Sequence, residues 1–84
     1  MSEEERFKFK ILWNLVRSRK WGHSYTRFEN VAGGLPGDEI GACLGVAEQL
    51  LKERILIPHK KGKFVSLNVR RKREIMEFLD RFSE

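Results

Sequence analysis

Residues 38–67, DEIGACLGVAEQLLKERILIPHKKGKFVSL, contain the patterns that decide the fold. In the first half, apolar residues recur at helical spacing, which predicts an amphipathic helix from about 39 to 54. These residues are Ile40, Cys43, Leu44, Ala47, Leu50 and Leu51. Asp38 stands where a side chain would cap the first turn of this helix. The face opposite the apolar residues holds Asp38, Gly41, Ala42, Gly45, Glu48, Gln49 and Lys52.

The second half of this stretch predicts a β-hairpin over residues 55–67. Two β-prone runs, ILIP at 55–58 and FVSL at 64–67, flank a lysine-rich loop. Gly62 lies where a hairpin loop needs a residue of unusual backbone conformation. We therefore expect a helix followed directly by a hairpin with a basic tip.

Two helices are predicted before this stretch. The first covers about 3–20, with acidic residues in its first turn and basic residues in its last. Its apolar positions are Phe7, Ile11, Leu12, Leu15 and Val16. Thr26 and Glu29 fit a capping box, which predicts a short helix over about 27–32 that ends at a glycine-rich turn. Between the two helices, residues 21–25 lack a helical period and form either a very short strand or an extended link.

A further helix is predicted after the hairpin, over about 69–82, with Asn68 as its cap. Its apolar stripe is narrow and consists of Ile75, Phe78, Leu79 and Phe82. Together with Trp13, this stripe offers more apolar surface than so small a core needs. We expect the C-terminal helix either to cover the first helix or to form a homodimer through these residues. The whole chain, 1–84, is expected to be one domain.

The order of these elements resembles that of a winged helix-turn-helix domain. The run YTRFENVAGGLPGDEI at 25–40, followed by AEQLLKERILI at 47–57, carries the resemblance. It implies a mostly helical α+β fold in which the two central helices form the helix-turn-helix and the hairpin is the wing. The C-terminal helix is then an addition to this unit. Winged helices include transcription regulators, RNA binders and protein-binding modules, so the resemblance implies a fold and leaves several functions open.

The charge distribution favours binding to a polyanion. The chain carries a net charge of +5 with a pI near 9.7. Within 52–73, nine basic side chains face Glu53 as the sole acid. Clustered lysines and arginines release counterions from phosphates, which is how nucleic-acid binders gain affinity. The alternative is a solvated basic face that serves only solubility.

The candidate nucleic-acid contacts come from four segments. They are Lys60, Lys61 and Lys63 in the wing loop; Arg70, Arg71, Lys72 and Arg73 at the start of the C-terminal helix; Gln49 and Lys52 in the central helix; and Lys10 and Arg17 in the first helix. The wing lysines would contact phosphates without reading bases. The four cations at 70–73 would oppose the positive end of a helix dipole, so they have a use or the helix begins only near Arg73. Gln49 could pair with adenine, but the acidic face around it argues against deep insertion into a major groove.

The function expected on these grounds is DNA binding by a transcriptional regulator. One alternative is an interaction module that binds protein through Gly41, Ala42 and Gly45, and another is an RNA binder that uses the same basic patch. Trp13 is expected to pack on the C-terminal helix or on a second protomer, with base stacking as the less favoured role.

No enzyme, metal or cofactor site is expected. The glycines at 33–37 lack the Lys-Ser/Thr that a nucleotide-binding loop requires. His23 and His59 have no neighbouring ligands at metal spacing, and Cys43 is expected to be an inert core thiol. No apolar run is long enough to span a membrane, and a cytoplasmic location is expected.

Overall fold

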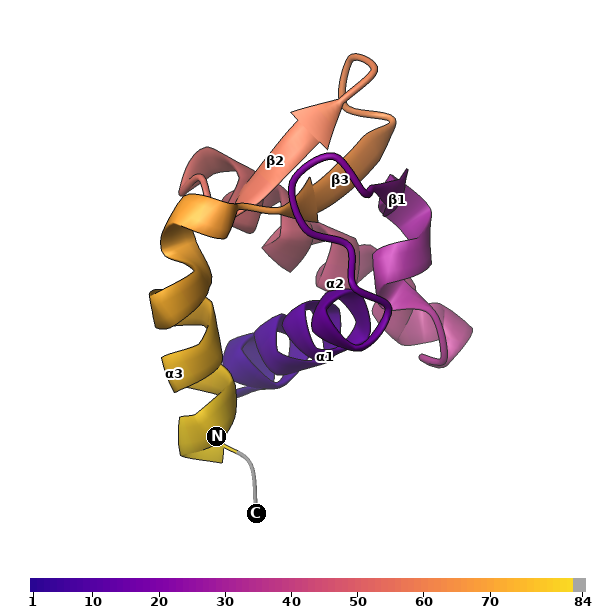
Figure 1. Ribbon diagram of the computed structural model, residues 1–84. Coiled ribbons are helices and arrows are strands. Elements are labelled where there is room, and N and C mark those ends of the chain that lie inside the picture. The colour runs from indigo at the N-terminus through magenta and orange to yellow at the C-terminus, as the bar shows by residue number, and fades with distance from the viewer. Residues whose placement is uncertain (83–84) are drawn as a thin grey trace.

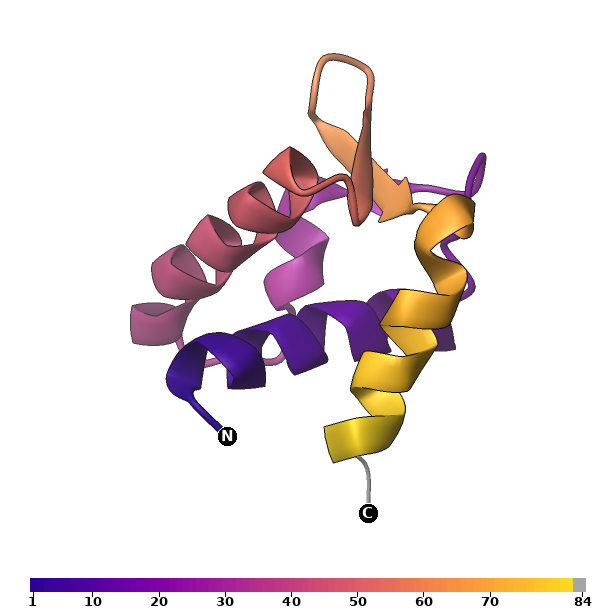
Figure 2. The same ribbon diagram turned by 90° about the vertical axis from the view of Figure 1, so that its left-hand side faces the viewer.

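The computed structural model describes residues 1–82 and shows three α-helices, two short 3-10 helices and three strands. Helix α1 (Glu3–Arg17) packs against both α2 (Gly37–Lys52) and α3 (Lys72–Phe82). The hairpin of β2 (Leu56–His59) and β3 (Phe64–Leu67) projects from the rest of the molecule (Figures 1 and 2). The fold is therefore α+β and mostly helical, as expected.

Helix α1 begins with a complete capping box. The Ser2 hydroxyl accepts a hydrogen bond from the Glu5 backbone, and the Glu5 carboxylate accepts one from the Ser2 backbone. These bonds hold the pKa of Glu5 below its usual value. The helix ends at Arg17, so the predicted end near residue 20 is wrong by three residues. The physical reason is the backbone at Arg19, whose φ of 59° is not helical.

Both long helices end in the same way. After α1, the Arg19 and Lys20 amides donate to the Val16 and Leu15 carbonyls. After α2, the Arg54 and Ile55 amides donate to the Leu51 and Leu50 carbonyls, which is the same Schellman pattern. In each case an arginine with positive φ occupies the place where glycine is usual.

The predicted capping box at Thr26 is wrong. Thr26 and Arg27 form a strand, β1, and the Phe28 amide donates to the Lys63 carbonyl at 2.9 Å. Because the sheet holds this backbone extended, no α-helix begins here, and residues 28–32 form the 3-10 helix η1 (Phe28–Ala32) without a side-chain cap. The Thr26 hydroxyl instead accepts a hydrogen bond from the Asn30 side chain.

Helix α2 starts two residues earlier than predicted, with Pro36 as its N-cap residue and no side-chain cap. Asp38 therefore lies in the first turn, where its charge favours the helix dipole, rather than at the cap. Cys43, Ala47 and Leu50 are buried as predicted. Ile40 is 37% exposed, which corrects its assignment to the core, because the first turn of α2 lies at the edge of the molecule (Figure 2).

The sheet is antiparallel, with the strand order β1-β3-β2. Strand β2 begins one residue later than expected and β3 has the expected bounds. Thr26 pairs with Val65, and Leu56 pairs with Leu67. In the preceding link, Trp21 forms a single parallel bridge to Leu67. The hairpin is thus supported along one side by the chain that connects α1 to η1.

The C-terminal helix begins with a 3-10 turn, η2 (Val69–Arg71), and α3 follows from Lys72 rather than from residue 69. The Asn68 cap is confirmed, because its side-chain oxygen accepts a hydrogen bond from the Arg70 amide at 3.0 Å. The late start of α3 leaves fewer of the cations at 70–73 inside its first turn, where they would oppose the dipole.

The apolar stripe of α3 packs into the core of its own chain. Ile75, Phe78 and Leu79 are each at most 5% exposed, and α3 contacts α1. These residues are therefore not free to form the proposed dimer interface. Phe82 is half-buried and lies against Phe78. Of the two predicted roles for this helix, the structure shows that it covers α1.

Candidate nucleic-acid interface

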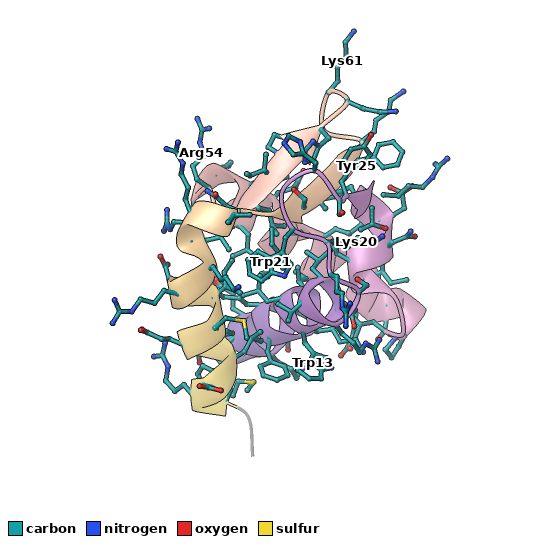
Figure 3. All side chains as sticks on the ribbon, in the orientation of Figure 1. Trp13, Lys20, Trp21, Tyr25, Arg54 and Lys61 are labelled. Carbon is teal, nitrogen blue, oxygen red and sulfur yellow. The ribbon has the colours of Figure 1, made fainter. Side chains whose placement is uncertain are left out.

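The tip of the hairpin is a tight turn built from lysines. The Gly62 amide donates to the His59 carbonyl at 3.1 Å, and the two residues between them, Lys60 and Lys61, have φ values of 50° and 60°. Positive φ at both central residues is the requirement of a type I′ turn, where Asn-Gly is the favoured pair. Lys61 points outward from the end of the β2–β3 hairpin, the segment that the resemblance predicts to be the wing and that is called the wing below (Figure 3).

Positive φ in this protein coincides with positive charge. Among residues 1–82, the non-glycine residues with positive φ are Arg19, Arg54, Lys60 and Lys61. A side chain in this conformation costs roughly 1–2 kcal/mol relative to the right-handed one. At Arg19 and Arg54 the nearby helix C-terminus favours a cation and offsets part of this cost. Lys60 and Lys61 lie in the hairpin loop and not at a helix C-terminus, so no helix dipole offsets their backbone cost.

An aromatic cluster lies beside the wing tip. The Tyr25 ring stacks on the His59 ring with centroids 4.5 Å apart and meets the edge of Phe64 at 5.3 Å. The Lys60 ammonium lies 5.8 Å from the Tyr25 ring centre, and the Arg27 guanidinium lies 5.7 Å from that of Phe64. Half-buried rings flanked by cations are the kind of surface that single-strand-binding proteins use to stack on bases and to contact the backbone.

A buried serine holds the His59 ring in place. Ser66 is fully buried, and its hydroxyl donates to the Gly22 carbonyl at 2.7 Å. The hydroxyl has a single hydrogen, so the 2.8 Å contact with His59 Nε2 requires that Nε2 carry a proton and donate. This fixes the orientation of the imidazole, and with it the ring on which Tyr25 stacks.

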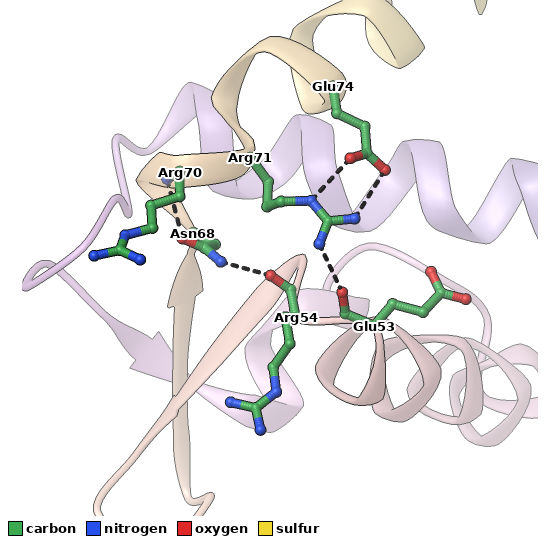
Figure 4. Close-up of polar contacts among 6 residues, drawn as sticks. All are labelled: Glu53, Arg54, Asn68, Arg70, Arg71 and Glu74. Carbon is green, nitrogen blue, oxygen red and sulfur yellow. Dashed lines mark hydrogen bonds and ion pairs between the residues drawn. The ribbon is translucent and has the colours of Figure 1, made fainter.

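A second basic group lies on the other side of the wing. Figure 3 places Arg54 and Tyr25 on opposite sides of the hairpin, and Figure 4 shows the Arg54 and Arg70 side chains extending toward the same side. The Asn68 amide donates to the Arg54 carbonyl at 2.7 Å and its oxygen accepts from the Arg70 amide. One asparagine therefore joins the end of α2 to the start of η2 and sets both arginines beside the base of the wing.

The remaining cations of this segment are engaged within the protein. Arg71 forms an ion pair with Glu74 at 2.8 Å and donates to the Glu53 carbonyl. The hydrogen-bonded pair raises the pKa of Arg71 and lowers the pKa of Glu74. Arg73 pairs with Glu77 at 3.2 Å. Lys72 lies 5.8 Å from the Trp21 ring centre. Of the four cations predicted here, Arg70 is the one best placed to contact a ligand at the wing.

The outer face of α2 is exposed, as predicted, and uncovered. A methyl group at Gly37, Gly41 or Gly45 would meet no atom within 4 Å, so no other described segment packs on this face. Gln49 donates to the Glu53 carboxylate at 3.1 Å, and Lys52 is exposed in the last turn. The protein contact that the interaction-module alternative assigns to Gly41, Ala42 and Gly45 would therefore have to be with another molecule.

The candidate residues in α1 lie on different parts of the surface. Lys10 and Arg17 line a groove between α1 and η1. Trp13 is 46% exposed and stacks on Phe9 of the same helix at 6.3 Å. The expected packing of Trp13 on the C-terminal helix is therefore wrong, and the alternative, packing on a second protomer, stays a prediction. Figure 3 shows Trp13 at the end of the molecule opposite Lys61, far from the wing.

Several residues of this surface were not identified from the sequence. Tyr25, Phe64 and Arg27 line one side of the wing, Arg54 lies on the other side (Figure 3), and Lys20 lines a groove beside α1. The alternation in the strand at 64–67 could have indicated that Phe64 and Ser66 share a face. The pairing of β1 with β3, which brings Tyr25 to the wing, has no local signal.

Within residues 1–82 no group of histidine, cysteine and acidic side chains has a geometry suited to a metal ion. Cys43 is buried, and burial raises the pKa of its thiol, which disfavours the reactive thiolate. No helix in the described part of the chain has both the length and the apolar character needed to cross a bilayer. Comparisons with protein-family models, curated proteins and solved structures give no match to this chain.

Proposed function

We propose that this protein is a winged-helix DNA-binding protein that acts as a transcriptional regulator, with the β2–β3 hairpin as its wing. The observation that carries the proposal is the wing tip, where Lys60 and Lys61 occupy a turn that favours Asn-Gly. Residues in costly backbone conformations are concentrated at functional sites. We therefore infer that lysine stands at these two positions because its positive charge is used in binding.

In this proposal η1 and α2 stand where the two helices of a helix-turn-helix would, although η1 is a single 3-10 segment. The wing lysines contact backbone phosphates, and Arg54 and Arg70 contact the backbone on one side of the wing. Tyr25 and Phe64 pack against sugars or exposed bases on the other side. Such contacts position the protein and contribute affinity that depends little on sequence.

Helix α2 stays outside the major groove in this mode of binding. Asp38 and Glu48 are exposed on its outer face and would meet the phosphates with like charge. Gln49, which could read adenine, already donates to Glu53. Sequence preference is therefore expected to be weak, and to come from DNA shape more than from base contacts.

The test is a titration of duplex DNA at several salt concentrations. Replacing Lys61 and Lys63 by glutamine should weaken binding and reduce the slope of log affinity against log salt by about 2, since each lost phosphate contact removes about 0.9. A matched control, Lys8→Gln with Arg81→Gln, removes the same charge near Phe78, away from the wing. It should leave the slope close to that of the wild type.

The alternatives predict other results. Tighter binding to duplex RNA than to duplex DNA under the same conditions would favour an RNA-binding function. No binding by the wild type to either nucleic acid at about 50 mM salt would refute the proposal. It would favour the protein-interaction module, for which the open face around Gly41 and Gly45 is the available surface.

A further inference from the structure

We propose that the groove between α1 and η1 is a binding site for phosphate groups, separate from the wing tip. The groove has a volume of about 420 Å³ and is formed by the C-terminal half of α1, the residues that follow it, Thr26 of β1 and the segment from Asn30 to Gly34. Its cations are Lys10, Arg17 and Lys20, and no acidic residue lines it.

The absence of acids from this lining contrasts with the surroundings of four arginines elsewhere on the surface. Elsewhere in the described chain, Arg6, Arg27, Arg71 and Arg73 each lie within 4 Å of a carboxylate. The three groove cations form no such ion pair within residues 1–82. Like charges gathered around a concave surface raise the local potential and concentrate anions there.

The neutral polar side chains of the groove are bonded within the protein. Asn14 donates to the Val31 carbonyl, Asn30 donates to the Thr26 hydroxyl, and Ser18 donates to the Asn14 carbonyl. These bonds shape the groove and use one donor each of Asn14, Asn30 and Ser18. The cations supply the charged donors for a ligand, beside the second amide hydrogens of the two asparagines and the Thr26 hydroxyl.

The backbone at Gly34 makes room for one of these cations. Gly34 has a φ of 89°, and a Cβ atom at this position would lie 3.3 Å from the Lys10 ammonium. A side chain here would be strained by the backbone, and the flexible end of the lysine would have to shift by a few tenths of an ångström. The glycine lets Lys10 lie across the turn after η1, at the wall of the groove opposite α1.

The groove is open to solvent on one side, and its size accommodates a ligand larger than one phosphate ion. One water occupies about 30 Å³ in the liquid, so the volume of the groove exceeds that needed by a single phosphate ion. A phosphate with an attached sugar, or two linked phosphates, is a better match. Such a group could belong to a nucleic-acid strand or to a free phosphorylated small molecule.

A nucleic-acid strand as the ligand rests on the proposed function, whereas a free phosphorylated small molecule does not. Thr26 lines the groove and pairs with Val65 of β3, so the groove adjoins the strand layer that carries the wing. A strand held at Tyr25 and the wing tip could thus continue along β1 to Lys20 and Arg17. The two sources share one chemistry, which is a phosphate bound by clustered cations.

The experiment follows backbone amide shifts during titration with inorganic pyrophosphate, and separately measures affinity for single-stranded and duplex DNA. Pyrophosphate should cause saturable shifts at Asn30, Gly33 and Gly34. In Lys10→Gln with Lys20→Gln, its affinity should fall about tenfold or more, which is the loss expected for a charge-assisted contact. The Lys8→Gln with Arg81→Gln control should bind pyrophosphate as the wild type does. If the double variant does not fold, Arg17→Gln, at an exposed position, takes its place.

The DNA arm distinguishes the sources. A smaller salt slope in the Lys10 and Lys20 variant would identify the ligand as a nucleic-acid strand. If the variant loses pyrophosphate affinity but binds DNA as the wild type does, the ligand is a free phosphorylated molecule. The same holds if no form of the protein binds DNA, and that result would refute the proposed function but not the groove proposal. The groove proposal is overturned if neither pyrophosphate nor DNA affinity depends on Lys10, Lys20 or Arg17.

Discussion

The turn at the wing tip predicts that stability and DNA binding change in opposite directions when its lysines are replaced. In the variant Lys60→Asn with Lys61→Gly, both residues match the preference of a type I′ turn. Glycine at position 61 removes a left-handed penalty of roughly 1–2 kcal/mol. Asparagine at position 60 relieves a smaller part of the same penalty, because its short polar side chain tolerates this conformation. The greater flexibility of glycine in the unfolded chain offsets about 0.5–1 kcal/mol of this gain in stability.

The net gain should therefore be about 1 kcal/mol or somewhat more. For a domain of this size, 1 kcal/mol corresponds to an increase in melting temperature of roughly 4–8 °C. DNA affinity should fall at every salt concentration, with a slope reduced by about 2 for two lost phosphate contacts. Thermal unfolding followed by circular dichroism and DNA titration by fluorescence anisotropy measure the two effects.

The Lys8→Gln with Arg81→Gln variant controls for net charge, because it removes the same two charges. It should show no increase in melting temperature and no change in salt slope. An unchanged melting temperature in the wing variant would mean that Lys60 and Lys61 bear no backbone cost. A raised melting temperature with unchanged DNA affinity would mean that their charge is not used for binding, and the reasoning would fail.

Three other predictions concern stability. Gly41→Ala should stabilise the fold by about 0.5–1 kcal/mol in urea unfolding, since helix propensity improves and the added methyl meets no atom within 4 Å; destabilisation would indicate a contact on this face. Ser66→Ala should cost about 1–3 kcal/mol because the Gly22 carbonyl loses its donor, and an unchanged midpoint would show that water replaces it. The lowered pKa of Glu74 means that its pair with Arg71 contributes stability above pH 4.5, which is lost as pH falls through the lower folded-state pKa. The effect should be small because both side chains are solvent-exposed, and Arg71→Gln should abolish it; the same acid-range loss in that variant would contradict the assignment.

Local patterns in the sequence account for much of the fold. The spacing of Phe7, Ile11 and Leu15 and that of Cys43, Ala47 and Leu50 predict which faces of α1 and α2 are buried. The Asn68 cap and the hairpin around Gly62 also follow from residues close in sequence. These features need no knowledge of the tertiary structure.

The errors occur where distant segments override local preference. Thr26 has the sequence of a helix cap, but pairing with Val65 holds it in a strand. Arg19 and Arg54 continue runs of good helix formers, yet each adopts a positive φ because the following residue enters the sheet layer or the core. Tertiary packing decides such positions, and the local sequence does not record it.

The candidate site was predicted only in part, because some of its residues are neighbours in the sequence and others are brought together by tertiary pairing. The lysines of the wing loop are adjacent in the sequence, so their clustering is visible there. Tyr25 and Phe64 are far apart in the chain, and only the β1–β3 pairing brings their rings together. The engagement of Arg71 and Arg73 by acids one turn away also depends on where α3 begins.

The most direct test of the central claim is to map the amide shifts of the isotope-labelled protein during titration with duplex DNA at about 50 mM salt. The account predicts that the largest changes fall at Tyr25 and Arg27 and at residues 59–64 of the wing, with smaller ones at Arg54 and Arg70. Changes confined to the outer face of α2 around Gly41 and Gly45, or no changes at all, would contradict it.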